Sequence, residues 1–343
     1  MPNPVLTEAI DRLASRRDLA ADEAAAVLRE IMEGRSSEAE TAALLVGLRT
    51  KGETVDELVG LARTMRELAT RVEVDREDLL DTAGTGGGHP TFNVSTTAAF
   101  VAAGAGCVVA KHGNRSATGR SGSADVLEAL GARIELEPAA VAECIEAVGF
   151  GFMFAPAHHA AMKHVVPVRK ALAVRTIFNF LGPLTNPAGA TRQLIGVSDP
   201  GYMDTIAAAL GQLGAERALV VSSEDGLDEI GVSGPTRAVE LRDGRIDTRA
   251  ITPEGLGVEP AAAAEIGAGE PHESAALARQ VLDGRPGPDR SIVVMNAGAA
   301  IYVGGGAETL EAGARAAEQA IDSGAARDAL ERFVERSREL APS

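Results

Sequence analysis

The chain lacks much of what several classes of protein require. It contains no tryptophan and only two cysteines, and aromatic residues make up 3% of its 343 residues. Cys107 and Cys144 each stand inside an apolar segment, so we expect neither a disulfide framework nor a cysteine metal site, and we expect a cytoplasmic protein. The shortage of aromatic rings also leaves few candidates for stacking on single-stranded nucleic acid.

Positive charge is scarce as well. The 33 basic residues face 49 acidic ones, which gives a formal net charge of −16 at pH 7. This balance argues against a general binder of nucleic acid or of an anionic membrane. No apolar run reaches the roughly 20 residues that cross a bilayer, and no signal-peptide pattern precedes the first predicted helix. We therefore expect a globular protein with no nucleic-acid or membrane partner, in which any anion site is local.

What is present predicts an α/β protein of two domains. Apolar residues make up 45% of the chain, enough for a large core. Residues 1–72 carry helical periodicity and two capping-box patterns, Ser37 with Glu40 and Thr54 with Glu57. They predict a small all-helical N-terminal domain. Residues 73–343 alternate strand-like and helical segments, which predicts a larger α/β domain with a mainly parallel sheet.

The strand pattern of the larger domain is a series of short apolar runs. We predict strands at 79–83, 106–110, 150–154, 193–197, 218–222 and 291–295. The proline- and glycine-rich segment 252–271 is typical of a surface excursion, and the last helices should run from about residue 308 to 340.

Two glycine-rich stretches follow neighbouring predicted strands. One runs from Asp81 to Gly88 and the other from Lys111 to Arg115, with a predicted helix at 95–103 between them. Successive loops of a parallel sheet share its carboxyl edge, where ligands bind. Glycines let backbone NH groups approach a ligand, and a helix start adds unpaired donors, so we expect an anion, in the first place a phosphate. Lys111 and Arg115 would add positive charge.

The first glycine stretch fits neither common nucleotide-binding pattern. His89 stands where a dinucleotide fold would need a third glycine after Gly84 and Gly86, and no Gly-Lys-Ser/Thr follows. An ordinary tight turn is the alternative, but four glycines in the five positions 84–88 exceed what a turn requires.

Two polar segments at predicted helix starts point to the same edge. Residues 93–97 offer one amide and three hydroxyls, and residues 121–125 open the next predicted helix. Capping uses one hydroxyl, which leaves others for phosphate or a metal-bound water. Simple capping remains the alternative for both segments.

Asp228 and Glu229 follow the predicted strand 218–222. Adjacent carboxylates at a strand end suit magnesium, which takes oxygen ligands and keeps several waters. In so acidic a chain, a solvated pair is the alternative.

A basic segment follows the predicted strand 150–154, and no acidic residue interrupts it between Glu146 and Arg175. Its charged and titratable members are His158, His159, Lys163, His164, Arg169 and Lys170. If the segment is helical, His159 and Lys163 share a face. This segment is either a pocket for a small carboxylate or a basic helix flank. Zinc is not expected because no Glu follows His159.

Taken together, these motifs resemble those of the anthranilate phosphoribosyltransferase family over nearly the whole chain. The matching segments, in family order and spacing, are 84–87, 93–96, 111–115, 121–125, 182–187 and 228–229. The resemblance implies a fold of the nucleoside phosphorylase and phosphoribosyltransferase type, with helices near 160–180 joining residues 1–72. It also implies a homodimer, magnesium as cofactor, and transfer of phosphoribose from phosphoribosyl pyrophosphate to the amine of anthranilate in tryptophan biosynthesis.

The resemblance assigns the site residues. Phosphoribosyl pyrophosphate would be held by Gly84, Gly87, Gly88, Thr91, Asn93, Ser95, Thr96, Lys111, Asn114 and Ser123. Anthranilate would be bordered by Gly84, Asn114, His159, Arg169 and Pro183. The metal would be bound by Ser95, Asp228 and Glu229. Lys111, Asp228 and Glu229 would be catalytic: Lys111 and the magnesium that the carboxylates bind would stabilise the charge on the leaving pyrophosphate, whereas His112 receives no proton-transfer role.

Two departures from the family pattern carry expectations. Gly88 stands where many members have Asp, and the loop is one residue shorter before Thr91, so we expect an altered magnesium dependence with the reaction preserved. Ala160 follows His159 where the family usually has Pro, which affects local helix geometry.

Two other functions stay open. A pyrimidine nucleoside phosphorylase of the same fold is disfavoured by the Asn114 loop and the Asp228–Glu229 pair. A non-catalytic nucleotide sensor would bind without forming product.

Overall fold

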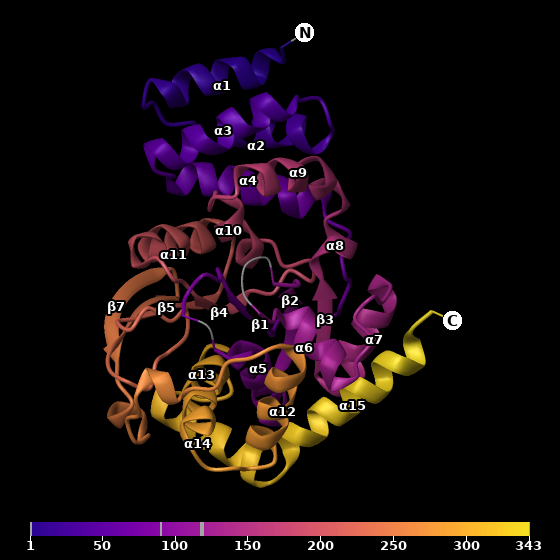
Figure 1. Cartoon of the computed structure of the whole chain (residues 1–343), viewed down its shortest axis with the longest axis vertical. Helices are drawn as coiled ribbons and strands as arrows, with labels where there is room; N and C mark the ends of the chain where they lie inside the picture. The colour runs from indigo at the N-terminus through magenta and orange to yellow at the C-terminus, as the bar shows by residue number, and fades with distance from the viewer. Residues whose placement is uncertain (1, 90, 117–119, 343) are drawn as a thin grey trace.

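The computed structural model describes residues 2–89, 91–116 and 120–342. In this part of the chain a seven-stranded sheet runs in the order β3-β2-β1-β4-β5-β6-β7 (Figure 1). The strands are Leu79–Gly84 (β1), Val108–Gly113 (β2), Phe150–Phe154 (β3), Arg192–Gly196 (β4), Arg217–Ser223 (β5), Thr236–Arg242 (β6) and Arg245–Ile251 (β7). Strands β1 to β5 are parallel, and β6 and β7 add an antiparallel edge. The mainly parallel sheet is confirmed.

The N-terminal segment is all helical, as predicted, and forms four helices. They are α1 (Pro4–Ala14), α2 (Ala21–Met32), α3 (Glu38–Lys51) and α4 (Val55–Leu68). Both predicted capping boxes are present, since Ser37 Oγ accepts from Glu40 N and Thr54 Oγ1 accepts from Glu57 N, each at 3.3 Å. The apolar residues of these helices pack against one another at the N-terminal end of the molecule (Figure 1).

Helices cover both faces of the sheet. The apolar side chains on each face pack into a separate hydrophobic core. One face is covered by α5 (Val94–Gly104), α12 (Pro271–Leu282), α13 (Pro288–Val303), α14 (Leu310–Asp322) and α15 (Ala325–Leu340). On the other face, α11 (Met203–Gln212) and the four N-terminal helices share one core. Leu219 of β5 joins the first core and Val220 joins the second, because successive strand residues point to opposite faces.

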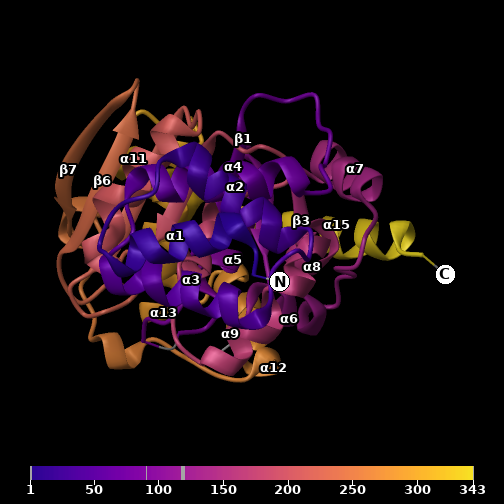
Figure 2. The ribbon, with the colours of Figure 1, turned by 90° about the horizontal axis from the view of Figure 1, so that it is seen from above.

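The helical domain packs on α11, which lies between α4 and the strands β5 and β6 (Figure 1). Seen from above in Figure 2, its helices lie over the strands, with β6 and β7 at one side and the end of α15 extending at the other. The last two helices, α14 and α15, cover most of the predicted span from about 308 to 340.

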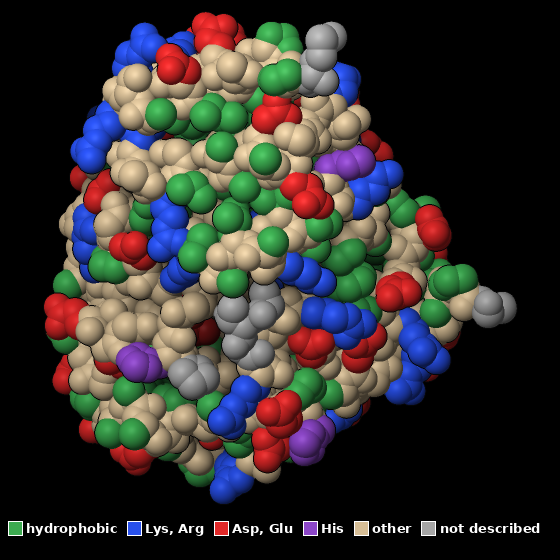
Figure 3. Space-filling view, turned by 45° about the horizontal axis from the view of Figure 1, so that its top comes forward, with side chains coloured by type: hydrophobic (Ala, Val, Ile, Leu, Met, Phe, Trp, Pro, Cys, Tyr) green, Lys and Arg blue, Asp and Glu red, His purple; other side chains and the backbone are tan. Residues whose placement is uncertain are grey.

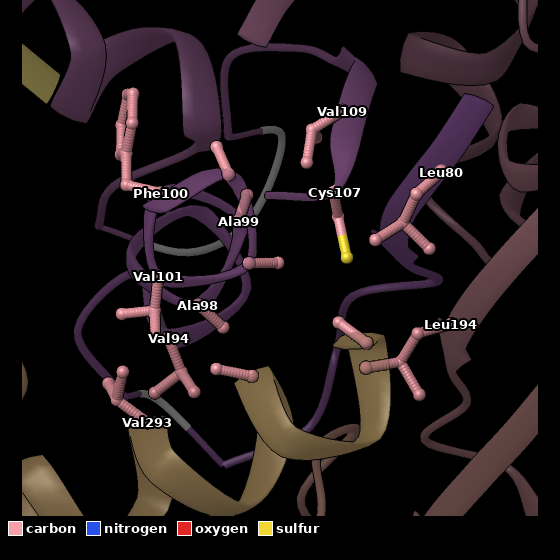
Figure 4. Packing of buried hydrophobic residues seen from close by; sticks show 14 of the residues in the cluster. Leu80, Val94, Ala98, Ala99, Phe100, Val101, Cys107, Val109, Leu194 and Val293 are labelled. Atoms are coloured by element: carbon pink, nitrogen blue, oxygen red, sulfur yellow. The ribbon is translucent and has the colours of Figure 1, made fainter. Parts of the chain in front are cut away.

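One predicted strand is wrong. Residues 291–295 belong to α13, a helix in which the twelve consecutive residues from Ile292 to Val303 are buried. A helix that is apolar on all sides has no amphipathic period, so its sequence cannot be told from a buried strand. Figure 4 shows Val293 on this helix, in the same buried cluster as Val94 of α5.

The remaining helices stand after β2 and after β3, and in the described part of the chain it is those after β3 that reach the helical domain. Two of them, α6 (Ser123–Leu130) and α7 (Pro138–Val148), stand between β2 and β3. After β3 come α8 (Ala155–His158), α9 (Val166–Leu172) and α10 (Phe178–Leu181), with α9 packed against α3. His159 ends α8 with φ −119° and a 3-10 helix follows at Ala160–His164, so His159 and Lys163 do not share the face of one α-helix.

Within the described residues, no helix is long and apolar enough to span a membrane. On the face shown in Figure 3, basic and acidic side chains are interspersed. Because the described residues form no large basic patch on this face, an anion bound there would depend on nearby hydrogen-bond donors.

Candidate active site

The order of the strands changes direction between β1 and β4. From β1 the chain continues to β2 and β3 on one side, and it adds β4 and β5 on the other. Such a point leaves a crevice at the carboxyl ends of the two strands, where ligands of open α/β sheets bind. Here those ends are Gly84 and Gly196, which are direct partners in the sheet register.

Asp228, from the loop after β5, lies directly against this glycine pair. Its Oδ2 accepts a hydrogen bond from Gly86 N at 3.0 Å. A Cβ atom on Gly84 would lie 2.8 Å from Asp228 Oδ2, and one on Gly196 would lie 1.5 Å from the main-chain oxygen of Asp228. Only glycine permits this approach, so Gly196 belongs to the site. Sequence reasoning missed it because the signal lies in the pairing of β4 with β1.

Gly88 packs against the same acidic loop. A Cβ atom there would lie 2.9 Å from Gly226 O and 3.0 Å from Asp228 N. The next residue, His89, donates from its main-chain N to Gly226 O at 3.3 Å. An aspartate at position 88 could not adopt this loop shape without a shift, which gives a physical reason for the glycine. The altered magnesium dependence stays a prediction.

The two polar helix starts are bonded to each other. Asn93 Nδ2 donates to Ser121 O at 3.1 Å, and Ser121 Oγ donates to Asn93 Oδ1 at 2.8 Å. Asn93 makes no side-chain cap for α5, so capping does not explain this residue. Thr96 Oγ1 is buried and has no hydrogen-bond partner among the described residues. Its oxygen is therefore available to a ligand.

Ser95 and Ser123 stand in the first turns of α5 and α6, and both are partly exposed. Asn114 lies beside the start of α6, since its main-chain oxygen accepts from Ala124 N at 3.2 Å and from Ser123 Oγ at 3.3 Å. The structure thus brings the predicted phosphate residues of α5, α6 and the β2 end to one edge of the sheet.

Lys111 lies in strand β2, not in the loop after it, and it is only 2% exposed. Its Nζ donates to the Thr82 main-chain oxygen and, at 3.1 Å, to Thr82 Oγ1. Burial lowers the pKa of Lys111 to about 8, while the negative charges of Asp81 and Glu229 oppose that fall. The side chain therefore remains mostly cationic at pH 7.

The expectation that Arg115 adds free positive charge to the site is wrong. Its guanidinium pairs with Asp125 and Glu128 of α6 and lies over the Phe154 ring, 5.5 Å from the ring centroid. Two acidic neighbours already balance this charge.

Asp81 and Asn186 form a buried polar network beneath the loops. Asp81 accepts from Asn186 Nδ2 at 2.7 Å and from His112 N at 3.1 Å, and Asn186 Nδ2 also donates to Ala110 O at 2.8 Å. Burial raises the pKa of Asp81 to about 6, although Lys111 and the hydrogen bonds oppose the rise. The network joins β1, β2 and the segment 182–187. Sequence reasoning quoted both residues within motifs but gave neither a role.

The acidic pair has the chemistry that a divalent cation requires. Burial raises the pKa of Glu229 well above its usual value, and the neighbouring Asp228 adds to the rise. Glu229 Oε2 is buried without a hydrogen-bond partner in the described part of the chain. A divalent cation would compensate both costs.

Protein ligands for such a cation are few. The described residues contain no group of three or more His, Cys, Asp or Glu side chains that could hold a metal ion. Magnesium is commonly bound through one or two carboxylates together with waters and substrate phosphates. The residues present fit that mode of binding.

Two of the predicted anthranilate residues lie close to His112. The ring centroids of His112 and His159 are 5.2 Å apart, and His112 Nδ1 lies 3.3 Å from the main-chain oxygen of Gly182, next to Pro183. Burial lowers the pKa of His112 to about 3 and that of His159 to about 4. Both rings are therefore neutral and weakly basic at pH 7.

Arg169 lies on α9, with its guanidinium carbon 5.6 Å from the centroid of the Phe178 ring. Burial lowers its pKa from the ordinary arginine value. No hydrogen bond among the described residues joins it to His159. Arg169 and His159 therefore both lie in the segment that follows β3, but they are not bonded to each other.

Comparison with known proteins agrees with this architecture. Residues 7–69 match the model of the glycosyl transferase family, helical bundle domain, and residues 76–327 match that of the glycosyl transferase family, a/b domain. The fold and the site thus define a glycosyltransferase of this two-part class.

Individual relatives narrow the class. The chain is 55% identical over 339 residues to the anthranilate phosphoribosyltransferase of Rubrobacter xylanophilus, covering 98% of this chain and 99% of that protein. It is 51% identical to that of Thioalkalivibrio sulfidiphilus, covering 96% and 98%. The crystal structure of the Thermus thermophilus enzyme matches with a TM-score of 0.91 at 46% identity, over 96% of this chain and 99% of that one.

A more distant structure includes ligands. The Saccharomyces cerevisiae enzyme in complex with PRPP and Mg matches with a TM-score of 0.89 at 26% identity, over 98% of each chain. From these similarities, the chain belongs to the anthranilate phosphoribosyltransferase family.

Proposed function

We propose that this chain transfers phosphoribose from phosphoribosyl pyrophosphate to the amine of anthranilate, forming N-phosphoribosyl anthranilate and pyrophosphate in tryptophan biosynthesis. The observation that carries the proposal is the crevice between β1 and β4, where Asp228 lies on the Gly84–Gly196 pair. Lys111 and the two polar helix starts stand at the same edge. The near-full-length similarity to enzymes of this name supports it.

The phosphoribosyl pyrophosphate would bind through the glycine loop and the starts of α5 and α6. The residues assigned to it are Gly84, Gly87, Gly88, Thr91, Asn93, Ser95, Thr96, Lys111, Asn114 and Ser123. The unpartnered Thr96 hydroxyl and the backbone NH groups of the loop supply donors there. Cationic Lys111 would stabilise the charge that develops on the leaving pyrophosphate.

Ser95, Asp228 and Glu229 would hold Mg²⁺. The buried, unpartnered Glu229 oxygen supports this assignment, as does the presence of Mg in the yeast enzyme's complex. When bound, the ion would neutralise pyrophosphate charge. The role of this chain's own residues is to place the two carboxylates next to the glycine loop, through Gly84 and Gly196.

The acceptor would lie toward His159, Pro183, Gly84 and Asn114, with Arg169 pairing with its carboxylate. An aromatic amine is neutral at pH 7, so it needs no strong base before it attacks. The low pKa values of His112 and His159 agree with orienting roles for both rings.

We further propose a homodimer, a cytoplasmic location and a division of the chain at residues 72 and 73, with the helices near 160–180 joined to the first part. The packing of α9 on α3 supports that joining.

The test is loss of anthranilate fluorescence when purified protein is mixed with phosphoribosyl pyrophosphate and magnesium, with a control lacking magnesium. Magnesium-dependent loss is the expected result. Binding of phosphoribosyl pyrophosphate without loss of fluorescence would contradict the transferase function and favour a nucleotide sensor. Phosphorolysis of a pyrimidine nucleoside would instead favour a phosphorylase.

A further inference from the structure

Arg175 connects the helical domain to the glycine loop. It stands between α9 and α10, and its main-chain oxygen accepts from Arg49 Nη1 of α3 at 2.6 Å. Its guanidinium donates to Gly86 O at 2.6 Å and to Ser198 Oγ at 2.7 Å. One residue is thus bonded to the helical domain through its main chain and to the loop through its side chain.

The loop is held from both sides at a single residue. Gly86 O accepts from Arg175 and from Ser198 Oγ, the latter at 2.8 Å, while Gly86 N donates to Asp228 Oδ2 at 3.0 Å. A Cβ atom on Gly87 would lie 2.9 Å from Arg175 Nη1. The guanidinium therefore packs directly on the turn.

This turn requires such support. Gly86 and Gly87 both have positive φ, +65° and +84°. Glycine adopts this conformation at little cost, but it adopts other conformations equally readily. A run of glycines has little side-chain packing to fix its shape, so hydrogen bonds from outside the loop must do so. Asp228 fixes the amide of Gly86, and Arg175 with Ser198 fixes its carbonyl.

We propose that Arg175 is a positioning residue for the donor substrate: it holds the glycine loop in the shape that receives phosphoribosyl pyrophosphate and makes that shape depend on the helical domain. This role rests on the proposed function. It is distinct from that of Arg169, six positions earlier, which would act on the acceptor.

The central variant is Arg175→Ala. We expect its KM for phosphoribosyl pyrophosphate to rise about tenfold, as for loss of one hydrogen bond to a charged group, while its KM for anthranilate at saturating donor stays within about twofold of wild type. Arg175→Lys should give an intermediate value because an ammonium cannot reproduce the two-pronged geometry of the guanidinium.

The matched control is Arg192→Ala. Arg192 also donates from its guanidinium to a main-chain oxygen, that of Gly304 at 2.7 Å, but it lies at the opposite end of β4. Its removal should lower the melting temperature without a selective change in the donor KM.

Ser198→Ala is the alternative test of the proposal if Arg175→Ala does not fold. Because both side chains donate to Gly86 O, Ser198→Ala should raise the donor KM in the same direction by a smaller factor, and the double variant should show less than the product of the two single effects.

Calorimetric binding of phosphoribosyl pyrophosphate with magnesium separates this proposal from the proposed function, because it needs no turnover. Weaker donor binding in Arg175→Ala than in wild type and Arg192→Ala supports the positioning role, even if no fluorescence is lost. Unchanged donor binding, equal rises in both KM values, or full recovery in Arg175→Lys would overturn it.

Discussion

The position of Asp228 depends on two residues without side chains. Gly84 and Gly196 face each other across β1 and β4. The Asp228 carboxylate lies against Gly84, and the Asp228 backbone leaves no room for a Cβ atom at Gly196. The adjacent carboxylates are therefore held by packing against backbone. The position of the acidic pair therefore depends on the missing side chains of the two glycines as well as on the acidic residues themselves.

Gly196→Ala should remove most of the activity. The added Cβ would have to displace the main-chain oxygen of Asp228, which it would otherwise approach to 1.5 Å. We expect kcat/KM to fall about 100-fold, the order of loss that follows a misplaced group in an active site. Steady-state kinetics measure this, with Gly234→Ala as control because a Cβ there would meet nothing within 4 Å. Near-normal activity in Gly196→Ala would show that the acidic loop adapts.

Lys111 predicts an alkaline limit on activity. The side chain is cationic below its pKa of about 8 and neutral above it, and only the cation can stabilise pyrophosphate charge. The pH profile of kcat/KM for the donor reports the free enzyme, so this value should fall as the pH rises through about 8. In kcat the fall should lie at higher pH because the bound anion favours the cation. A kcat/KM profile that stays flat to about pH 9.5 would contradict this role.

Arg169 and Lys170 form a natural comparison. Both are basic and adjacent, but Arg169 is partly buried over Phe178 whereas Lys170 is exposed. Arg169→Ala should raise the KM for anthranilate about tenfold or more, with little change in kcat, because a hydrogen bond between charged groups is lost. Lys170→Ala should leave it unchanged. A collapse of kcat at constant KM would remove Arg169 from acceptor binding.

Among the elements, the short helix α9 ends in an unusual way. Ala173, its C-cap, has φ +51° and ψ +29°, a left-handed conformation that disfavours a side chain. This residue lies between Arg169 and Arg175, so the turn it makes sets the direction of the chain between two arginines for which we propose roles in acceptor binding and in support of the glycine loop.

Ala173→Gly should therefore stabilise the protein by roughly 0.5–1 kcal/mol, the cost of the left-handed conformation less the added freedom of glycine in the unfolded chain. Ala171→Gly, inside α9 and exposed, should destabilise it by about 1 kcal/mol because glycine is a poor helix former. Denaturant unfolding of the two variants measures the difference. Effects of the same sign would mean that position 173 is not strained.

The elements also show where sequence patterns succeed. The N-terminal helices have capping boxes and amphipathic faces, and β3 has a short apolar run, so local rules predict them. Helix α13 is apolar on all sides and was mistaken for a strand. Strand β7 is exposed at every residue but the last and reads as polar, so it was not predicted. Strand β6, in which buried and partly exposed residues mix, was not predicted either.

For the whole molecule, the decisive feature is the core that crosses the domain boundary. Leu28 and Leu58 of the helical domain belong to the same buried cluster as Val220 of the sheet. We expect one cooperative unfolding transition, because neither part can lose that shared core without exposing apolar surface of the other. Calorimetry at several scan rates measures this. Two separate transitions would show that the parts unfold independently.

The sequence by itself determined the class of fold, the helical N-terminal segment, the parallel strands β1 to β5 and the motifs of the family. These follow from periodicity, capping and loop composition, which are local. It placed Lys111, Asp228 and Ser95 among the site candidates because such residue types at strand ends and helix starts carry recognisable chemistry.

Only the tertiary structure decided which residues stand next to one another. It paired Gly84 with Gly196, seated Asp228 on them, neutralised Arg115 with two acids of α6 and brought Arg175 from the connecting segment to Gly86. These contacts join residues about 90 to 140 positions apart in several cases. A local pattern cannot contain them, because they arise from the order of strands in the sheet and from the packing of the helical domain over its edge.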